Sequence, residues 1–124
     1  MSTTTGRTVL GLVMARIIDP LVEVRPDSTV ADAHRLMCQR GAPALPVLAG
    51  TRQVGSITLK TASSFGLEAG VTLVRDAMDS PLPELDESAT FEEVESAVAR
   101  SGAALITRDD FPIGLLTASD VRLA

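Results

Sequence analysis

The chain has 124 residues, an excess of acidic side chains, a formal net charge of −5 and a pI near 4.7. This balance argues against nucleic-acid binding, because affinity for phosphate backbones comes chiefly from lysine and arginine. The chain also has no tryptophan or tyrosine on which bases could stack, and no stretch approaches the roughly 20 apolar residues of a membrane span. A single cysteine, Cys38, excludes a disulfide within the chain. We therefore expect a cytoplasmic protein with no nucleic-acid or membrane partner.

The first half of the chain predicts a strand, a helix, a β-hairpin and a second helix. LVEV (21–24) favours a short strand. In VADAHRLMCQR (30–40) the apolar residues Val30, Ala33 and Met37 recur at helical spacing, with Leu36 on the same face, and Gly41 is typical of a helix end. ALPVLA (44–49) and VGSIT (54–58) indicate a hairpin that turns around Gly50. A closing helix is expected to begin at Thr58.

The second half predicts the same order of elements. LPEL (82–85) favours a strand, and Thr90 with Glu93 forms a capping box ahead of Val94 and Val98, which stand at helical spacing. Gly102 marks the end of that helix. AALIT (103–107) and IGLLT (113–117) indicate a hairpin that turns at Asp109 and Asp110, and a closing helix is expected to begin at Thr117.

The two halves are copies of one unit. A shift of 61 residues places Val13, Pro20, Leu21, Glu23, Thr29 and Gly41 on Val74, Pro81, Leu82, Glu84, Thr90 and Gly102. The second hairpin is two residues shorter, so that Gly55, Thr58 and Thr61 then fall on Gly114, Thr117 and Asp120. Because the copy includes residues near the N-terminus, we expect the apolar run after Arg7 to be mature structure and not a signal peptide. The expected fold class is α/β of the α+β kind, with repeats at 8–66 and 67–124.

The repeated residues resemble the paired cystathionine-β-synthase (CBS) domains, also called the Bateman module, from about Thr8 to the end. The matching pieces are the lead-in segments VMARIIDPL and VRDAMDSPL, the helix that ends in glycine, ALPV at 44–47, and the two G-x-x-T-x-x-(D/T) segments. The resemblance implies that the repeats pack as one module with pseudo-two-fold symmetry. It also implies that a cleft between them binds an adenosine compound such as AMP, ADP, ATP or S-adenosylmethionine, and that the module regulates a partner.

In this family an aspartate at the position of Asp120 typically accepts both hydroxyls of a ribose, and Thr117 would meet the ribose or the first phosphate. Charge-assisted bonds of this kind are among the stronger hydrogen bonds. The local pattern alone also fits a capping box, in which Thr117 and Asp120 only begin the last helix. The other site residues that the resemblance implies are Ser119, beside Thr117, and Leu82, Pro83, Ala104, Leu105 and Ile106, around the base.

The corresponding residues of the first half are Thr58, Lys60 and Thr61. Thr61 offers a neutral hydroxyl and cannot act as a doubly accepting anion. We therefore expect this second site to be the weaker one, and at most one good ribose site in the chain.

No metal site, cofactor or catalytic residue is expected. His34 and Cys38 stand four residues apart on a helix, as two metal ligands can, but no other histidine or cysteine exists in the chain. The repeat also aligns His34 with Glu95, at a position that should face water. No nucleophile with an adjacent base is found, so the chain is not expected to be an enzyme.

Occupancy of the site is expected to act on another polypeptide or on a second copy of the chain. A ligand can bias the orientation of the two halves only by its differential affinity for the two states. The apolar fraction of 45% in so small a chain favours a homodimer. The alternative hypothesis is a structural self-association module whose ligand site is degenerate and empty.

Overall fold

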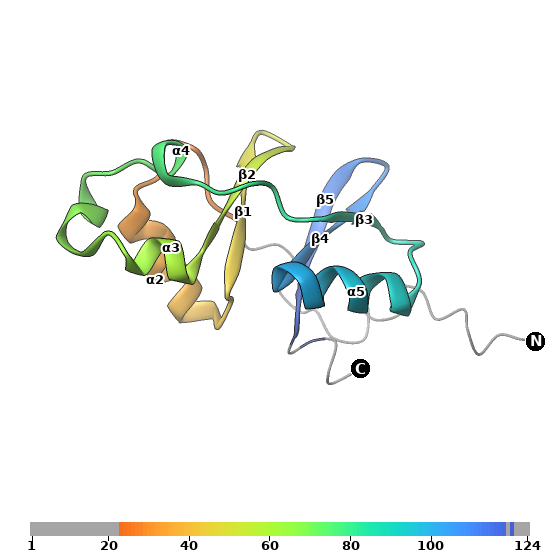
Figure 1. Cartoon of the computed structure of the whole chain (residues 1–124). Coiled ribbons are helices and arrows are strands. Elements are labelled where there is room, and N and C mark those ends of the chain that lie inside the picture. Colours follow the sequence, from red (N-terminus) through yellow and green to blue (C-terminus); the bar gives the residue numbers. More distant parts are fainter. Residues whose placement is uncertain (1–22, 119, 121–124) are drawn as a thin grey trace, which may run out of the picture. The chain divides into compact units, whose positions relative to one another are not determined.

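The computed structural model describes residues 23–118 and residue 120 (Figure 1). These residues divide after Leu82 into two compact units. Residues 67–82, which begin the second copy in the sequence, thus belong to the same unit as the first hairpin. The expected lead-in helix at 13–21 and the expected site residue Ser119 lie outside the described residues.

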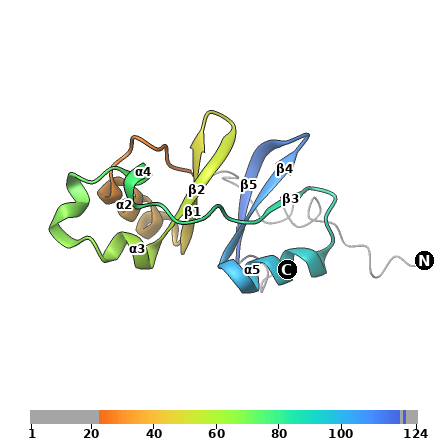
Figure 2. The same ribbon diagram turned by 45° about the horizontal axis from the view of Figure 1, so that its top comes forward.

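The unit formed by 23–82 is built around the hairpin of β1 (Ala44–Ala49) and β2 (Arg52–Thr58), which pair antiparallel. Helix α2 (Val30–Arg40) lies against β1 and also against α3 (Leu59–Ser63), α4 (Val74–Ala77) and the 3-10 helix η2 (Gly66–Gly70). The views in Figures 1 and 2 agree that α2, α3 and α4 lie on one side of this hairpin.

Helix α2 forms where the sequence predicts it. Thr29 caps its start, because its hydroxyl accepts from the backbone N–H of Asp32 and the Asp32 carboxylate accepts from the N–H of Thr29. Gly41 ends the helix in the left-handed conformation, with φ of 67°. Of the four apolar residues predicted to share a face, Val30, Ala33 and Met37 are buried and Leu36 is partly buried. The predicted period is confirmed.

The described part of the other unit is a three-stranded sheet with one helix. Its strands are β3 (Glu84–Asp86), β4 (Ala103–Arg108) and β5 (Phe111–Thr117), in the order β3-β4-β5, with β3 parallel and β5 antiparallel to β4. Helix α5 (Phe91–Ser101) lies against β4, with the predicted capping box at its start and Gly102 at its end. A core of side chains joins the helix to the sheet; its buried members are Val94, Ala97, Val98, Ala104, Ile106 and Leu116.

Two predicted strands differ from the observed ones. In the part of 21–24 that the structure describes, Val24 makes a single parallel bridge to Val47 and forms no strand. Strand β3 begins at Glu84 and not at Leu82. The reason is that the Gln53 side chain forms hydrogen bonds with both the N–H and the carbonyl of Leu82, and that Pro83 has no N–H to donate to a neighbouring strand. The predicted closing helix after Thr58 is confirmed, and Ala118 and Asp120 are helical after Thr117.

Candidate functional site

Thr117 and Asp120 meet at the end of β5. Oδ2 of Asp120 accepts a hydrogen bond from the backbone N–H of Thr117, at 2.9 Å between N and O, and one from the Thr117 hydroxyl, at 3.2 Å. Both residues are partly buried. Among the described residues, no partner is seen for Oδ1. The carboxylate is therefore held in place through one oxygen, as in a helix cap, while the other can accept further hydrogen bonds.

The three predicted site residues on β4 lie on different faces of the sheet. Ala104 and Ile106 are buried in the core between the sheet and α5, so their side chains are covered by protein. Leu105 lies between them on the strand and its side chain points to the opposite face, because strand residues alternate. Of the three, only Leu105 offers a side chain outside the α5 core.

Leu82 and Pro83 have their backbone groups engaged within the protein. The Leu82 carbonyl accepts from Nε2 of Gln53 at 3.1 Å, and its N–H donates to Oε1 of the same side chain at 2.7 Å. The carbonyl of Pro83 accepts from the N–H of Leu105 at 2.9 Å. A purine edge at this place would have to use second lone pairs of the carbonyls or side-chain contacts.

The unit formed by 23–82 holds a carboxylate, Asp79, that sequence reasoning missed. The Thr58 hydroxyl accepts from the N–H of Thr61 and donates to the Thr61 hydroxyl, each at 3.0 Å. The Thr61 hydroxyl in turn donates to Asp79, with its oxygen 3.1 Å from Oδ2 and 3.4 Å from Oδ1. Lys60, between the two threonines, is exposed. A Thr–Thr–Asp chain thus stands where the second repeat has Thr117 and Asp120.

The backbone holds Asp79 firmly beside β2. Its N–H donates to the carbonyl of Ser56 and its carbonyl accepts from the N–H of Ser56, at 2.6 and 3.0 Å. The Ser56 hydroxyl, in a buried residue, donates to the carbonyl of Ser80 at 2.6 Å. A Cβ added at Gly55 would lie 2.9 Å from the Asp79 carbonyl oxygen and 2.6 Å from Sδ of Met78. The glycine that opens the first G-x-x-T segment therefore lets the 78–80 segment approach the strand.

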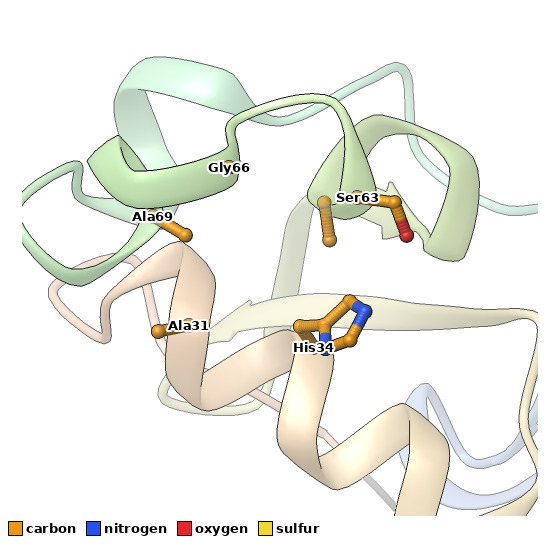
Figure 3. A pocket seen from close by; sticks show the side chains of 6 residues that line it. Ala31, His34, Ser63, Gly66 and Ala69 are labelled. Atoms are coloured by element: carbon orange, nitrogen blue, oxygen red, sulfur yellow. The ribbon is translucent and has the colours of Figure 1, made fainter.

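A pocket of about 370 Å³ opens elsewhere in this unit, between α2 and the α3–η2 segment. It is lined by Ala31, His34, Ala62, Ser63, Gly66 and Ala69, none of which was predicted as a site residue; Figure 3 shows His34 and Ser63 among these lining side chains, on facing segments. His34 was expected to face water like Glu95, but it is partly buried because it lines this pocket. Its Nδ1 lies 3.9 Å from Sγ of Cys38. Within 23–118 and 120, no three potential metal ligands gather.

The family model for the CBS domain matches residues 9–65 and again residues 74–124. The chain belongs to the CBS domain family. An inosine-5'-monophosphate dehydrogenase of Korarchaeum cryptofilum is 32% identical over 108 residues, which are 85% of this chain but 22% of that protein. This chain therefore spans about a fifth of the relative it matches.

Solved CBS structures share the fold. One crystal structure of a CBS domain has a TM-score of 0.82 at 25% identity, over 94% of this chain and 95% of the other. CBSX2 from Arabidopsis thaliana has a TM-score of 0.78 at 20% identity, over 96% and 94% of the two chains. CBSX2 has also been solved in complex with AMP, with a TM-score of 0.75 at 21% identity over 95% of each chain. A CBS-pair module is a regulatory ligand-binding domain and not a catalytic one. No helix in the described part of this chain is long and apolar enough to cross a membrane.

Proposed function

We propose that this CBS protein is a regulatory module that binds an adenosine-type ligand, namely AMP, ADP, ATP or S-adenosylmethionine, and transmits its occupancy to a partner or within a dimer. The observation that supports this most is the Asp120 carboxylate, fixed through Oδ2 by Thr117. A carboxylate ordered before the ligand arrives loses little entropy on accepting ribose hydroxyls. The AMP complex of CBSX2 supports the ligand class. Of the proposed contacts on β4, only the Leu105 side chain lies outside the α5 core, and it is 2% exposed.

A thermal-shift panel with AMP, ADP, ATP, NAD and S-adenosylmethionine tests this proposal. A ligand present at 100 times its dissociation constant stabilises the folded state by about 2.7 kcal/mol. Because the chain lacks tryptophan and tyrosine, absorbance near 260 nm in the purified protein would also reveal carried-over nucleotide. If none of the five ligands raises the melting temperature, the proposal is wrong, and the self-association module with an empty site is favoured.

We further propose a homodimer formed through the helical side of the 23–82 unit. Two large apolar side chains there are left uncovered: Leu67 is 102% exposed and Val71 is 83% exposed. Both belong to the segment around η2, which also lines the pocket next to α2. Uncovered apolar side chains beside a groove of small residues suit a self-complementary, two-fold contact.

Sedimentation at tens of micromolar tests the dimer. The parent protein should sediment as a dimer, and Leu67→Glu should shift it to the monomer. Phe111→Glu is the matched control, because Phe111 is 58% exposed but lies on the hairpin of the other unit. A monomeric parent protein, or a dimer broken equally by both substitutions, would contradict this interface.

A further inference from the structure

The structure assigns a second diol-binding carboxylate to the 23–82 unit: we propose that Asp79, with Thr58 and Thr61, accepts the vicinal hydroxyls of a ribonucleoside. This inference rests on the proposed function and deepens it. It concerns a residue outside the G-x-x-T-x-x-(D/T) segments, contributed by the stretch that follows α4. The carboxylate that Thr61 lacks is thus supplied from another part of the same unit.

The hydrogen-bond chain fixes the direction of every donor. The N–H of Thr61 donates to Thr58, the Thr58 hydroxyl donates to Thr61, and the Thr61 hydroxyl donates to Asp79. The carboxylate ends this chain as an acceptor. Two carboxylate oxygens offer about four acceptor positions, and the Thr61 hydroxyl needs one of them. Asp79 therefore retains capacity for both hydroxyls of a diol.

Asp79 is also pre-positioned, although its side chain is exposed. Its two backbone hydrogen bonds to Ser56 and the bond from the Ser56 hydroxyl to Ser80 hold the segment against β2. The backbone of Asp79 is therefore fixed beside β2, and its carboxylate needs only a side-chain rotamer to reach Thr61. Lys60, exposed on the turn that carries Thr61, can attract the negative charge of a nucleotide.

The sequence repeat argues that this arrangement is specific to one half. Under the offset of 61, Asp79 aligns with Ile18, which cannot accept a hydrogen bond through its side chain, and Asp120 aligns with Thr61 under the offset of 59. Each of these two aligned pairs therefore contains one carboxylate, Asp79 in the first pair and Asp120 in the second. Because Asp79 is exposed and Asp120 is partly buried, water competes more strongly for Asp79, and its site should be the weaker of the two.

Calorimetric titration with AMP and with 2′-deoxy-AMP tests the assignment. The variants are Asp120→Ala, the double variant Asp120→Ala with Asp79→Ala, and the same double variant with Asp79→Asn, which keeps the volume of the side chain. Asp120→Ala should leave residual AMP binding. Either substitution of Asp79 should weaken this residual binding about 10- to 150-fold. The Asp79 variants should lose little further affinity for 2′-deoxy-AMP. Asp76→Asn, which removes an exposed carboxylate of α4, should change nothing.

The outcomes separate this inference from the proposed function. If the parent protein binds AMP but Asp120→Ala abolishes all binding, or if substituting Asp79 leaves the residual binding unchanged, then Asp79 holds no ligand and the proposed function stands. If the parent protein binds none of the adenosine compounds, both fail. Melting temperatures of the Asp79 variants within a degree or two of their backgrounds would show that the losses are not due to unfolding.

Discussion

The two repeats end their hairpins on equivalent threonines but reach a carboxylate in different ways. In the second repeat the Thr117 hydroxyl donates directly to Asp120, three residues later in the same segment. In the first repeat the Thr58 hydroxyl donates to Thr61, and Thr61 passes the chain on to Asp79, eighteen residues away. The acceptor at the end is chemically the same in both. The two carboxylates differ in their distance along the sequence from the threonine, in their burial, and in the number of threonine hydroxyls in the hydrogen-bond chain that leads to them.

This comparison shows that the threonine keeps its place at the end of the hairpin in both repeats, whereas the carboxylate comes from different positions in the chain. A threonine at the end of a strand caps the helix that follows with its own side chain, so its place is fixed by the backbone. A carboxylate needs only to reach that hydroxyl, and a segment held against the strand can supply it. The close approach of residues 78–80 to Gly55 is what makes this possible in the first repeat.

The largest expected effect is on the carboxylate that Thr117 holds. Asp120→Ala should remove a charge-assisted pair of hydrogen bonds and cost about 1.5 to 3 kcal/mol of binding free energy at the principal site, or roughly 10- to 150-fold in affinity for AMP. 2′-deoxy-AMP should bind the parent protein more weakly, yet lose little further in the variant. Calorimetric titration of both proteins with both ligands gives the double-mutant cycle that isolates this coupling.

Two controls separate a ligand contact from a helix cap. The melting temperature of Asp120→Ala without ligand reports the lost cap, which is worth about 1 kcal/mol. Thr61→Ala should reduce affinity at the principal site much less than Asp120→Ala. Equal affinity of Asp120→Ala and the parent protein, or a greater loss in Thr61→Ala, would show that the carboxylate is only a cap.

The next effect concerns the glycine that admits the 78–80 segment. Gly55→Ala should destabilise the protein by about 1 to 3 kcal/mol, because the new Cβ meets a backbone oxygen that cannot rotate away. The midpoint of urea unfolding measures this loss. Gly70→Ala is the matched control, since nothing lies within 4 Å of a Cβ added there and its φ is not positive. If the two variants unfold at the same urea concentration, then residues 78–80 do not lie as close to β2 as we describe.

A carboxylate introduced at Thr61, in the first G-x-x-T-x-x-(D/T) segment, should repel Asp79. Thr61→Asp would place a second carboxylate within hydrogen-bond distance of Asp79. The repulsion should cost up to about 1 kcal/mol at neutral pH, because both side chains are accessible to water. It should raise the pKa of the pair in the folded state, so the penalty is full above that raised pKa and disappears below the unfolded value.

The double variant decides whether the conflict is electrostatic. Thr61→Asp combined with Asp79→Ser leaves one carboxylate near Thr58, at the position that Asp120 has relative to Thr117 in the second repeat. Its urea midpoint at neutral pH should return towards that of the parent protein. If Thr61→Asp alone is as stable as the parent at neutral pH, the proximity of residues 61 and 79 is wrong.

Much of this fold could be predicted from the chain, since its signals are local. The spacing of Val30, Ala33 and Met37, and the Thr90–Glu93 box, act within one helix and were confirmed. The start of β3 could not be predicted, because Leu82 is taken by the side chain of Gln53, far away in the sequence. The same holds for Asp79, whose role depends on a contact across eighteen residues. The one hint in the sequence repeat is that Asp79 aligns with a residue that is not acidic, Ile18.

The smallest expected effect concerns the caps of the two long helices, where the repeats again use different acids. In α2, Oδ2 of Asp32 accepts from the backbone N–H of Thr29 at 3.3 Å between N and O. In α5, Oε1 of Glu93 accepts from the backbone N–H of Thr90 at 2.8 Å. The hydrogen bond from the Thr29 backbone, together with Arg35 nearby, lowers the pKa of Asp32 below its ordinary value of 3.8. A carboxyl whose pKa is lower in the folded state stabilises the protein above its unfolded pKa, and loses this contribution as the pH falls through the folded value.

Asp32→Asn should therefore reduce the urea midpoint at neutral pH by an amount equivalent to no more than about 1 kcal/mol, and this difference should shrink below pH 4. Asp27→Asn removes an exposed charge that is not part of the capping box and serves as the control. A loss in Asp32→Asn that stays constant from neutral pH down to pH 3 would mean that the ionised carboxylate is not what stabilises the start of α2.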